Sequence, residues 1–226
     1  MIMKILHHLE ESRSFRILWA LEELGLDYRV QFYKRLANLS APPELKKIHP
    51  LGKAPIFQDE EQCMAESAAI LEYLQEQYDI KNQFKPQRGQ ARHKYHYWLH
   101  YAEGSLMPLL VMQLVMTQVP KHTPFFVRPV AKKISEGVKK NFIGERLADH
   151  IAYLEQYLSQ HDFLVDEFSF ADIQMSFPLQ ALQQRTQQVY PHISAYLQRL
   201  KARPAFFRAL SKEQNLVCDY SSAGGQ

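Results

Sequence analysis

The sequence predicts a small α/β unit followed by an all-helical one, and two observations support this. In residues 1–79, short apolar runs alternate with segments whose apolar residues recur at helical spacing. From residue 88 onward, helical periodicity continues and no convincing strand pattern appears. Residues 80–87 are mostly polar, lack periodicity and contain Pro86, so they are expected to form a linker. We therefore expect a first domain at 1–79 and a second domain at 88–226.

The first domain is expected to run strand, helix, strand, hairpin, helix. Its elements are a strand at 3–6, a helix that stops at Gly25, a strand at 28–33, two short strands at 54–57 and 62–64, and a helix from Ser67. A helix that connects neighbouring strands makes a right-handed crossover, so the first two strands should pair in parallel. The segment 36–50, which holds three prolines, is expected to be irregular.

The second domain is expected to consist of helices that differ in length. The apolar spacing predicts helices at 88–107, 140–159, 170–183 and 192–200. Pro108 should interrupt or kink the first of them, and Pro178 should kink the third, because proline lacks the N–H that a helix interior needs.

The charge balance excludes some classes of partner. Lys plus Arg total 27 against 24 Asp plus Glu, so no broad basic field is available for nucleic acid or a membrane surface. The longest apolar run, 106–119, contains Pro108 and several polar residues, so we expect no membrane span. Cys63 and Cys218 lie far apart and form no disulfide framework, which suits a reducing cytoplasm.

A serine lies where the first strand ends and the first helix opens. Ser12 holds a favourable N-cap position, where free N–H groups and the positive end of the helix dipole stabilise an anion. A thiolate is such an anion, and lowering a thiol pKa by about two units needs only ~2.7 kcal/mol. One hydroxyl hydrogen bond to a charged group, with a helix end, is of that size. Plain capping by Ser12 stays an open alternative, and the rival hydroxyl of Ser14 is expected to be structural.

A second cluster, Lys53, Ala54 and Pro55, lies at the third strand. If the Ala54–Pro55 bond is cis, the N–H and C=O of Ala54 could face outward, and a peptide could pair there as an added strand. Lys53 would stand beside that edge, ready for a carboxylate. A plain loop with a solvated lysine is the alternative reading.

A third cluster, Glu66 and Ser67, opens the next helix. The acid can accept from an ammonium group, while Ser67 and the helix N-terminus can bind a carboxylate. Together they suit an amino-acid head group that carries both charges, although ordinary helix capping explains the same residues.

Three histidines share a helical face farther along the chain. His93, His96 and His100 are spaced i, i+3 and i+7, which could place imidazoles around a metal. Glu103 lies on the same face, but no cysteine completes a ligand set. We interpret the stripe as solvated or as part of an interface, and we expect no metal site.

Taken in this order, these clusters resemble the glutathione transferase family over nearly the whole chain. Ser12, with Arg16 four residues later, resembles the active-site serine and structural arginine of the serine-type classes. Residues 52–55 resemble the family's segment that ends in a cis-proline, and Glu66–Ser67 resembles the motif that heads the third helix. The resemblance implies a thioredoxin-like N-terminal domain followed by an all-helical C-terminal domain.

Further segments strengthen the resemblance. Ser169, with Asp172 three residues later, is similar to the family's N-capping box, in which the acid reaches back to the serine backbone; this site is structural. The segments 35–50 and 99–108 look like the theta-like branch of bacteria and fungi.

The resemblance also implies a role for each binding residue. The Ser12 hydroxyl would hydrogen-bond the glutathione sulfur and keep it ionised. Ala54, before Pro55, would pair with the cysteinyl backbone, and Lys53 would reach toward the glycyl carboxylate. Glu66 and Ser67 would hold the γ-glutamyl end, and Arg16 would orient the first helix. Glutathione would thus be a co-substrate.

The other reactant would be a small hydrophobic electrophile. Its pocket would lie between the Ser12 loop and the helix at 101–112, with Tyr101, Ser105 and Leu109 as lining residues. A homodimer is implied, with the first domain of one subunit meeting the second domain of the other, and so is a part in detoxification.

Two kinds of function follow as hypotheses. The first is an enzyme whose glutathione thiolate attacks electrophiles in conjugation or in glutathione-dependent peroxide reduction; the alternative is a non-catalytic binding or protein-interaction module. The presence of Ser12, Lys53, Glu66 and Ser67 favours the enzyme, because a scaffold has no physical need for all of them. Thiol transfer normally requires a cysteine at the Ser12 position.

Overall fold

The computed structural model describes residues 3–36, 38, 40–186 and 188–222, and the chain divides into two compact units. The first unit comprises Met1–Gln87 together with Leu200–Gln226, and the second comprises Arg88–Arg199. The end of the chain is expected in the helical domain, but from Leu200 onward the chain packs with the first unit.

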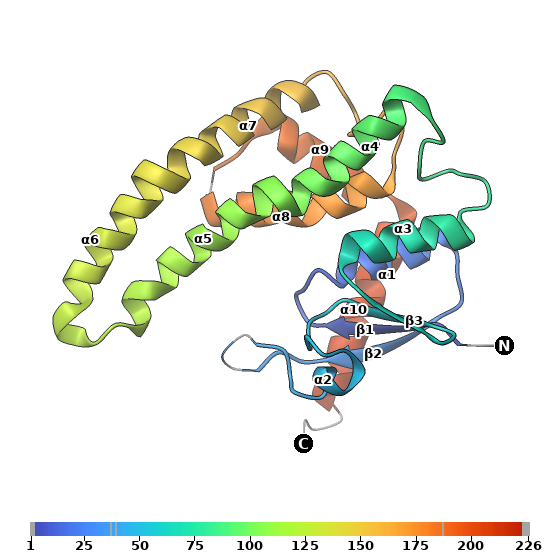
Figure 1. The fold of residues 1–226 in the computed structure, drawn as a ribbon, viewed down its shortest axis with the longest axis horizontal. Coiled ribbons are helices and arrows are strands. Elements are labelled where there is room, and N and C mark those ends of the chain that lie inside the picture. The colour runs from blue at the N-terminus through green and yellow to red at the C-terminus, as the bar shows by residue number, and fades with distance from the viewer. Residues whose placement is uncertain (1–2, 37, 39, 187, 223–226) are drawn as a thin grey trace. The chain divides into compact units, whose positions relative to one another are not determined.

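The first unit is built on a mixed sheet with the strand order β2-β1-β3-β4 (Figure 1). The strands are β1 Ile5–Leu9, β2 Arg29–Tyr33, β3 Ile56–Asp59 and β4 Gln62–Ala65. The strand β1 pairs in parallel with β2, which confirms the expected crossover, and β3 runs antiparallel to both of its neighbours.

Helices cover this sheet and close the unit. They are α1 Phe15–Leu24, α2 Leu45–Ile48, α3 Ser67–Tyr78 and α10 Pro204–Ser222. Helix α1 ends at Gly25, whose φ of 63° is the left-handed conformation that favours glycine at a helix end. Two helices of this unit were not expected: α2 lies inside the segment 36–50, and α10 lies beyond the last helix that the periodicity predicted.

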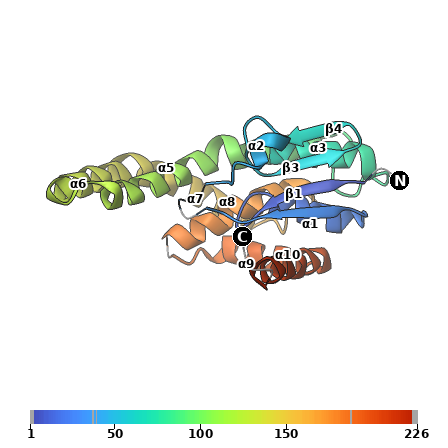
Figure 2. The same ribbon diagram turned by 90° about the horizontal axis from the view of Figure 1, so that it is seen from below.

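Helix α10 packs along α1 (Figure 2). The Phe206 ring meets the Trp19 ring edge to face at a centroid distance of 5.0 Å and the Phe15 ring at 5.3 Å. Arg203 donates two hydrogen bonds to the Glu23 carboxylate, at 2.6 and 2.9 Å. Apolar burial and a bidentate ion pair therefore hold the end of the chain on the first helix.

A buried carboxylate on α1 strengthens this contact. Glu22 accepts hydrogen bonds from Lys212 at 2.6 Å and Arg208 at 3.0 Å, and also from the Tyr28 hydroxyl at 2.6 Å. Burial alone would raise the pKa of Glu22, but these donors outweigh it and the pKa lies below its ordinary value of 4.5. Glu22 is therefore a charged anchor for α10.

The second unit consists of helices, and most of them form two long rods, residues 89–118 and residues 128–158 (Figure 1). They are α4 Gly89–Tyr101, α5 Met107–Gln118, α6 Arg128–Val138, α7 Glu145–Leu158, α8 Phe170–Thr186 and α9 Pro191–Lys201. A π-helical segment, Ala102–Leu106, joins α4 to α5, and another, Lys139–Gly144, joins α6 to α7. Short 3₁₀ turns, Val119–His122 and Phe125–Val127, connect the rods.

Pro108 does not end the first rod, as it could have done. It stands in the first turn of α5, directly after the π-helical segment. In a π-helical turn each carbonyl bonds to the N–H five residues later instead of four. The carbonyl that would pair with the missing N–H of Pro108 can therefore bond to the next N–H along the chain. The helix continues beyond Pro108 to Gln118.

A buried acid fixes the start of α8. Asp172 accepts hydrogen bonds from the backbone N–H groups of Leu164 at 2.9 Å and Ser169 at 2.8 Å. The hydroxyls of Ser169 and Tyr196 also donate to it, at 3.0 and 2.8 Å. Complete burial raises the pKa of Asp172 although these donors oppose the rise. The Ser169 hydroxyl thus binds the carboxylate, and Asp172 ties together the loop before α8 and the helix α9.

Apolar side chains are exposed along α5, α6 and the turn between them. They include Val111, Val115, Val119, Phe125, Phe126, Val130 and Ile134. Within the described part of the chain, no helix combines the length and apolar character needed to cross a bilayer.

The Glu22 anchor yields a stability prediction. The lowered pKa means that ionised Glu22 stabilises the fold above pH 4.5, and that this contribution is lost as the pH falls through the lower folded-state pKa. At neutral pH, Glu22→Gln should reduce the free energy of unfolding by roughly 1–2 kcal/mol, since two charge-assisted hydrogen bonds are weakened. Urea denaturation at several pH values measures the difference between the two proteins, which should shrink below pH 4.5.

The matched control is Asp27→Asn, which changes an exposed carboxylate just beyond the same helix. It should leave the unfolding free energy within about 0.5 kcal/mol of the parent protein. A pH-independent loss in Glu22→Gln would contradict the assignment.

Candidate functional site

The sheet register brings three separate segments to one edge of the first unit. Ile56, the first residue of β3, pairs with His7 of β1 and with Ala65, the last residue of β4. The turn after β1, the residues before β3 and the residues after β4 therefore meet at the same edge. These are the three segments that carry Ser12, Ala54–Pro55 and Glu66–Ser67.

Ser12 lies in the turn between β1 and α1 and is nearly buried. Helix α1 begins at Phe15 with Ser14 at the N-cap, so Ser12 stands before the helix and is not its N-cap residue. The carbonyl of Ser12 accepts the N–H of Phe15 at 3.2 Å, and its Oγ accepts the N–H of Ser14 at 3.1 Å. The Ser12 hydroxyl oxygen therefore accepts the N–H of the N-cap residue, although Ser12 itself lies two residues before that cap.

The backbone of this turn is held by an arginine from the segment that follows β2. Glu11 has a φ of 48°, a conformation that residues other than glycine seldom adopt. The Arg35 guanidinium donates to the carbonyls of Glu10 at 2.9 Å and Glu11 at 3.1 Å. These bonds fix the chain just before Ser12.

Behind Ser12 lies a chain of buried polar groups. Ser14 Oγ is 2.6 Å from Ser12 Oγ and 2.9 Å from His8 Nδ1. His8 Nε2 lies 3.0 Å from Glu213 Oε1, on α10. Sequence reasoning missed His8 and Glu213, because β1 residues carry no sign of a partner more than 200 positions away, and α10 itself was not predicted.

The segment before β3 has the geometry that the resemblance suggested. The Ala54–Pro55 peptide bond is cis, and the pairing of β3 begins at Ile56, so the N–H and C=O of Ala54 precede the strand ladder. Lys53 is exposed, while Ala54 and Pro55 are buried. At Gly52 the φ is 56°, and a Cβ would lie 2.6 Å from Lys46 Cγ, so only glycine fits this turn beside α2.

Glu66 and Ser67 stand at the opening of α3. Glu66 is the N-cap residue with a φ of 71°, and it is exposed, whereas Ser67 is buried. Ser67 Oγ accepts a hydrogen bond from the buried Arg16 at 3.0 Å, so Arg16 links α1 to the start of α3. The Ser67 hydroxyl keeps its proton available for donation, next to the N–H groups of the first turn.

The residues expected to line an electrophile pocket belong to the second unit. Tyr101 is buried and its hydroxyl hydrogen-bonds to His150 Nδ1, and burial, with the neighbouring tyrosines, raises its pKa. Leu109 is buried within the same unit, and Ser105, in the π-helical segment, is half-buried. Of the three, Ser105 is the most accessible.

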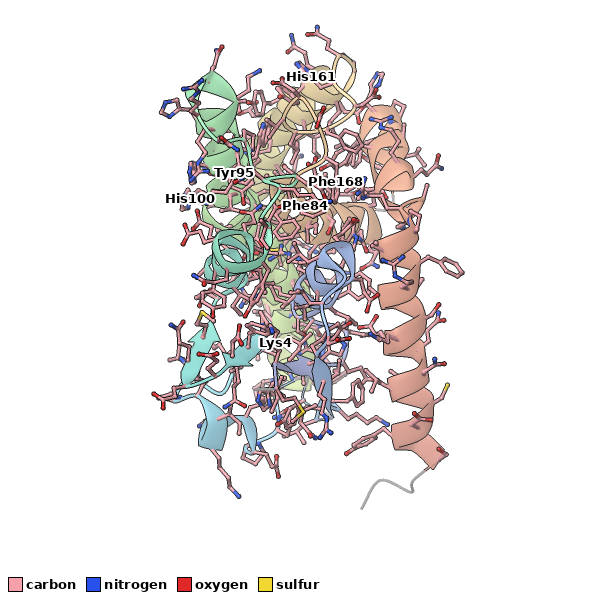
Figure 3. The ribbon with its side chains drawn as sticks, turned by 90° about the vertical axis from the view of Figure 1, so that its right-hand side faces the viewer. Lys4, Phe84, Tyr95, His100, His161 and Phe168 are labelled. Atoms are coloured by element: carbon pink, nitrogen blue, oxygen red, sulfur yellow. The ribbon has the colours of Figure 1, made fainter. Side chains whose placement is uncertain are left out.

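The histidine stripe on α4 faces outward. His93 and His100 are exposed and His96 is half-buried, whereas Tyr95 points to the helix packing on the other side (Figure 3). Among the described residues, no group of three or more His, Cys, Asp or Glu side chains could hold a metal ion.

Comparison with known proteins places the chain in a family. Residues 1–76 match the model of the glutathione S-transferase N-terminal domain, and residues 120–212 match that of a glutathione S-transferase C-terminal domain. The chain is 36% identical to glutathione S-transferase 3 of Schizosaccharomyces pombe, with 97% of this chain and 92% of the relative covered.

Solved structures agree with the sequence relatives. A glutathione S-transferase from Actinobacillus pleuropneumoniae superposes with a TM-score of 0.77 at 31% identity, covering 94% of this chain and 93% of its own. The glutathione transferase URE2P8 of Phanerochaete chrysosporium, crystallised with oxidized glutathione, shares the fold with a TM-score of 0.75 at 18% identity, covering 96% and 98%. The chain therefore belongs to the glutathione S-transferase family and is an enzyme of that family.

Proposed function

We propose that the enzyme binds glutathione on its first unit, ionises the glutathione thiol beside Ser12, and directs the thiolate at a small hydrophobic electrophile. The observation that carries this proposal is the meeting of Ser12, Ala54 and the Glu66–Ser67 pair at one edge of the sheet. Each supplies a group that one part of an extended tripeptide needs.

The tripeptide backbone would pair with Ala54, whose N–H and C=O precede the β3 ladder. At one end of the tripeptide, Glu66 would accept from the γ-glutamyl ammonium group, and Ser67 would donate to the adjacent carboxylate. At the other end, the exposed Lys53 would pair with the glycyl carboxylate. These contacts place the cysteinyl sulfur near the turn after β1.

At that turn, the Ser12 hydroxyl would donate a hydrogen bond to the sulfur and favour its ionised form. Hydrogen bonds to charged groups contribute about 1.5–3 kcal/mol, which corresponds to one or two units of thiol pKa. Holding the thiolate and the electrophile in one site then converts their encounter into a unimolecular step. The same thiolate could attack the O–O bond of a peroxide, forming an S–O bond while the alkoxide leaves, and a second glutathione would then convert the sulfenic acid to the disulfide and water. Glutathione-dependent peroxide reduction therefore belongs to the proposal.

A second proposal concerns the oligomeric state, the cellular location and the physiological role. We propose a homodimer in which the first unit of one subunit meets the second unit of the other, and a cytoplasmic, detoxifying role. The exposed apolar residues Val111 and Val115 on α5 support the dimer, because contiguous exposed apolar surface is typical of interfaces.

The alternative function is a non-catalytic module that binds glutathione or another protein. Retention on immobilised glutathione followed by a conjugation assay with an aryl halide separates the two. Retention without turnover would favour the binding module, and the proposal expects both retention and turnover.

The role of Ser12 leads to a kinetic prediction. Ser12→Ala should lower the conjugation rate by roughly 10–100-fold, because the hydrogen bond to the thiolate is lost, while glutathione retention changes little. Steady-state kinetics with an aryl halide measures the rate. Ser221→Ala, a serine exposed on α10, is the control and should behave like the parent enzyme. Unchanged turnover in Ser12→Ala would transfer the role to a backbone amide.

The role of Glu66 leads to a binding prediction. Glu66→Gln should weaken binding of S-methylglutathione by roughly 10-fold, because a charge-assisted hydrogen bond to the ammonium group becomes a neutral one. Calorimetric titration measures the affinity, and the methylated sulfur removes any effect on ionisation. Glu61→Gln, on the exposed turn between β3 and β4, should have no effect. Equal affinities of all three proteins would remove Glu66 from the site.

The dimer leads to a prediction on mass. Sedimentation should give a particle of two 26.5-kDa chains. The double substitution Val111→Glu and Val115→Glu should shift it to one chain, because burying charge in an apolar contact is costly. Val189→Glu, at another exposed valine, should leave the dimer intact. A single-chain mass for the parent protein would refute the dimer.

A further inference from the structure

The buried groups behind Ser12 form a continuous chain that thiol activation, as described above, does not use. The chain runs from Ser12 Oγ to Ser14 Oγ over 2.6 Å, and from Ser14 Oγ to His8 Nδ1 over 2.9 Å. It then passes through the imidazole to Glu213 Oε1, 3.0 Å from Nε2. The order of hydroxyl, imidazole and carboxylate is that of a nucleophile–base–acid triad, with one additional hydroxyl.

Burial decides which of these groups can meet a substrate. The exposed fraction is 0% for both Ser14 and His8 and 6% for Ser12. Ser14 therefore cannot act as a nucleophile on an external substrate, and His8 cannot contact one. Both ends of the chain reach the surface: Ser12 does so at the candidate site, and the Glu213 side chain, 20% exposed, does so at the opposite end.

The Ser14 hydroxyl has two inward acceptors within reach, His8 Nδ1 at 2.9 Å and the Leu9 carbonyl at 3.2 Å, and the shorter contact belongs to the chain. Ser14 N–H donates to Ser12 Oγ and Leu9 N–H donates to Ser14 Oγ. A neutral His8 that donates from Nε2 to Glu213 presents Nδ1 as an acceptor, so the Ser14 hydroxyl donates to it. The Ser12 hydroxyl then donates to Ser14 Oγ, and Ser12 Oγ has a lone pair toward the surface.

We propose that this chain carries the proton of the glutathione thiol to His8, so that the enzyme contains its own base for thiol ionisation. This inference rests on the proposed function, which places the sulfur beside Ser12. The S–H bond breaks and sulfur keeps its electron pair, while Ser12 Oγ takes the proton and passes its own to Ser14 Oγ. Ser14 passes its own proton to His8 Nδ1, where an N–H bond forms.

The product arrangement is satisfied at every atom. Ser12 now donates to the thiolate, Ser14 donates to Ser12 Oγ, and imidazolium Nδ1–H donates to Ser14 Oγ. The imidazolium also donates from Nε2 to the Glu213 carboxylate, which makes a charge-assisted pair. The transfer therefore turns the Ser12 hydroxyl toward the sulfur when the sulfur becomes charged. No oxidant or further reactant is needed.

The surroundings of His8 contain few competing charges. On its own strand, His7 is hydrogen-bonded to Tyr33 and Gln58 instead of to this chain. From β2, the Phe32 ring lies 6.0 Å from the His8 ring. From α10, Glu213 is the ionisable group bound to His8. A proton on His8 is thus balanced by one carboxylate on the last helix, and His8 and Glu213 act as positioning residues through Ser12.

The test measures both thiolate and proton. The ultraviolet absorption of the thiolate gives the pH at which bound glutathione is half ionised, and calorimetry in buffers of different ionisation enthalpy gives the number of protons released on binding. The parent enzyme should release clearly less than one proton per thiolate formed, because the proton stays on His8. His8→Asn and Ser14→Ala, which break the chain, should raise the half-ionisation pH by about one unit or more. Each thiolate that they form should release its proton to the solvent.

Glu213→Gln keeps a hydrogen bond to Nε2 and removes the charge, so it should produce a smaller shift in the same direction. The substitution lies at a partly exposed position and so tests the proposal even if a change at His8 or Ser14 prevents folding. His7→Asn is the matched control at the neighbouring histidine and should change neither readout. The double variant His8→Asn and Ser14→Ala should show no larger shift than either single variant, because both interrupt one path.

The outcomes separate this inference from the proposed function. If the parent enzyme binds glutathione and shows no thiolate band below the pH at which free glutathione ionises, the proposed function fails. If the parent enzyme shows the band, and folded His8→Asn and Glu213→Gln leave its pH and the proton count unchanged, the relay is wrong and the proposed function stands. A loss of stability without change in either readout would reduce the chain to a structural role and overturn the relay.

Discussion

The arrangement of the candidate site depends on the position of β3 between β1 and β4. Because β3 runs antiparallel to both neighbours, its first residue lies beside the end of β1 and the end of β4 at once. Antiparallel register is fixed by hydrogen bonds and by side-chain packing, and a slip of one residue would move every side chain of the strand to the opposite face. Ile56 and Phe57 point to opposite faces and are both fully buried, so a slip would force each into packing that fits the other and is strongly disfavoured.

The side chains around this edge of the sheet differ in exposure and in the partners that they bind. Exposed groups such as Lys53 and Glu66 are free to meet a charged ligand, whereas buried polar groups are committed to internal partners. Arg16 and Ser67 hold the openings of α1 and α3 together, and Arg35 holds the turn that precedes Ser12. The site therefore combines an accessible polar rim with a rigid inner layer, as preorganised binding requires.

Much of this arrangement could be predicted from the sequence, because the signals for it come from residues that are close together in the chain. Gly25 marks the end of α1, alternation marks β2, and the apolar spacing of the first helix identifies its buried face. Ser12, Lys53 and Glu66 each stand where one element ends and another begins, but these positions alone leave helix capping or a solvated loop open, and the resemblance to a known family singles the residues out. Such positions are recognisable without knowledge of the tertiary structure.

The parts that escaped prediction depend on distant contacts. Ser12 lies before the helix cap and not at it, because Ser14 takes that position and binds inward to His8. The pairing of His8 with Glu213 and the docking of α10 on α1 join residues from opposite ends of the chain. No local pattern in β1 or α10 encodes the partner, so only the folded structure reveals it.

The return of α10 to the first unit has a consequence for biosynthesis. Trp19 and Phe15 are covered by Phe206, and the whole second unit is translated between these residues and the helix that covers them. While the ribosome makes residues 88–199, the nascent first unit must therefore expose an aromatic face to the cell. Until α10 has been synthesised, the first unit therefore exposes more apolar surface to a chaperone than the folded protein does.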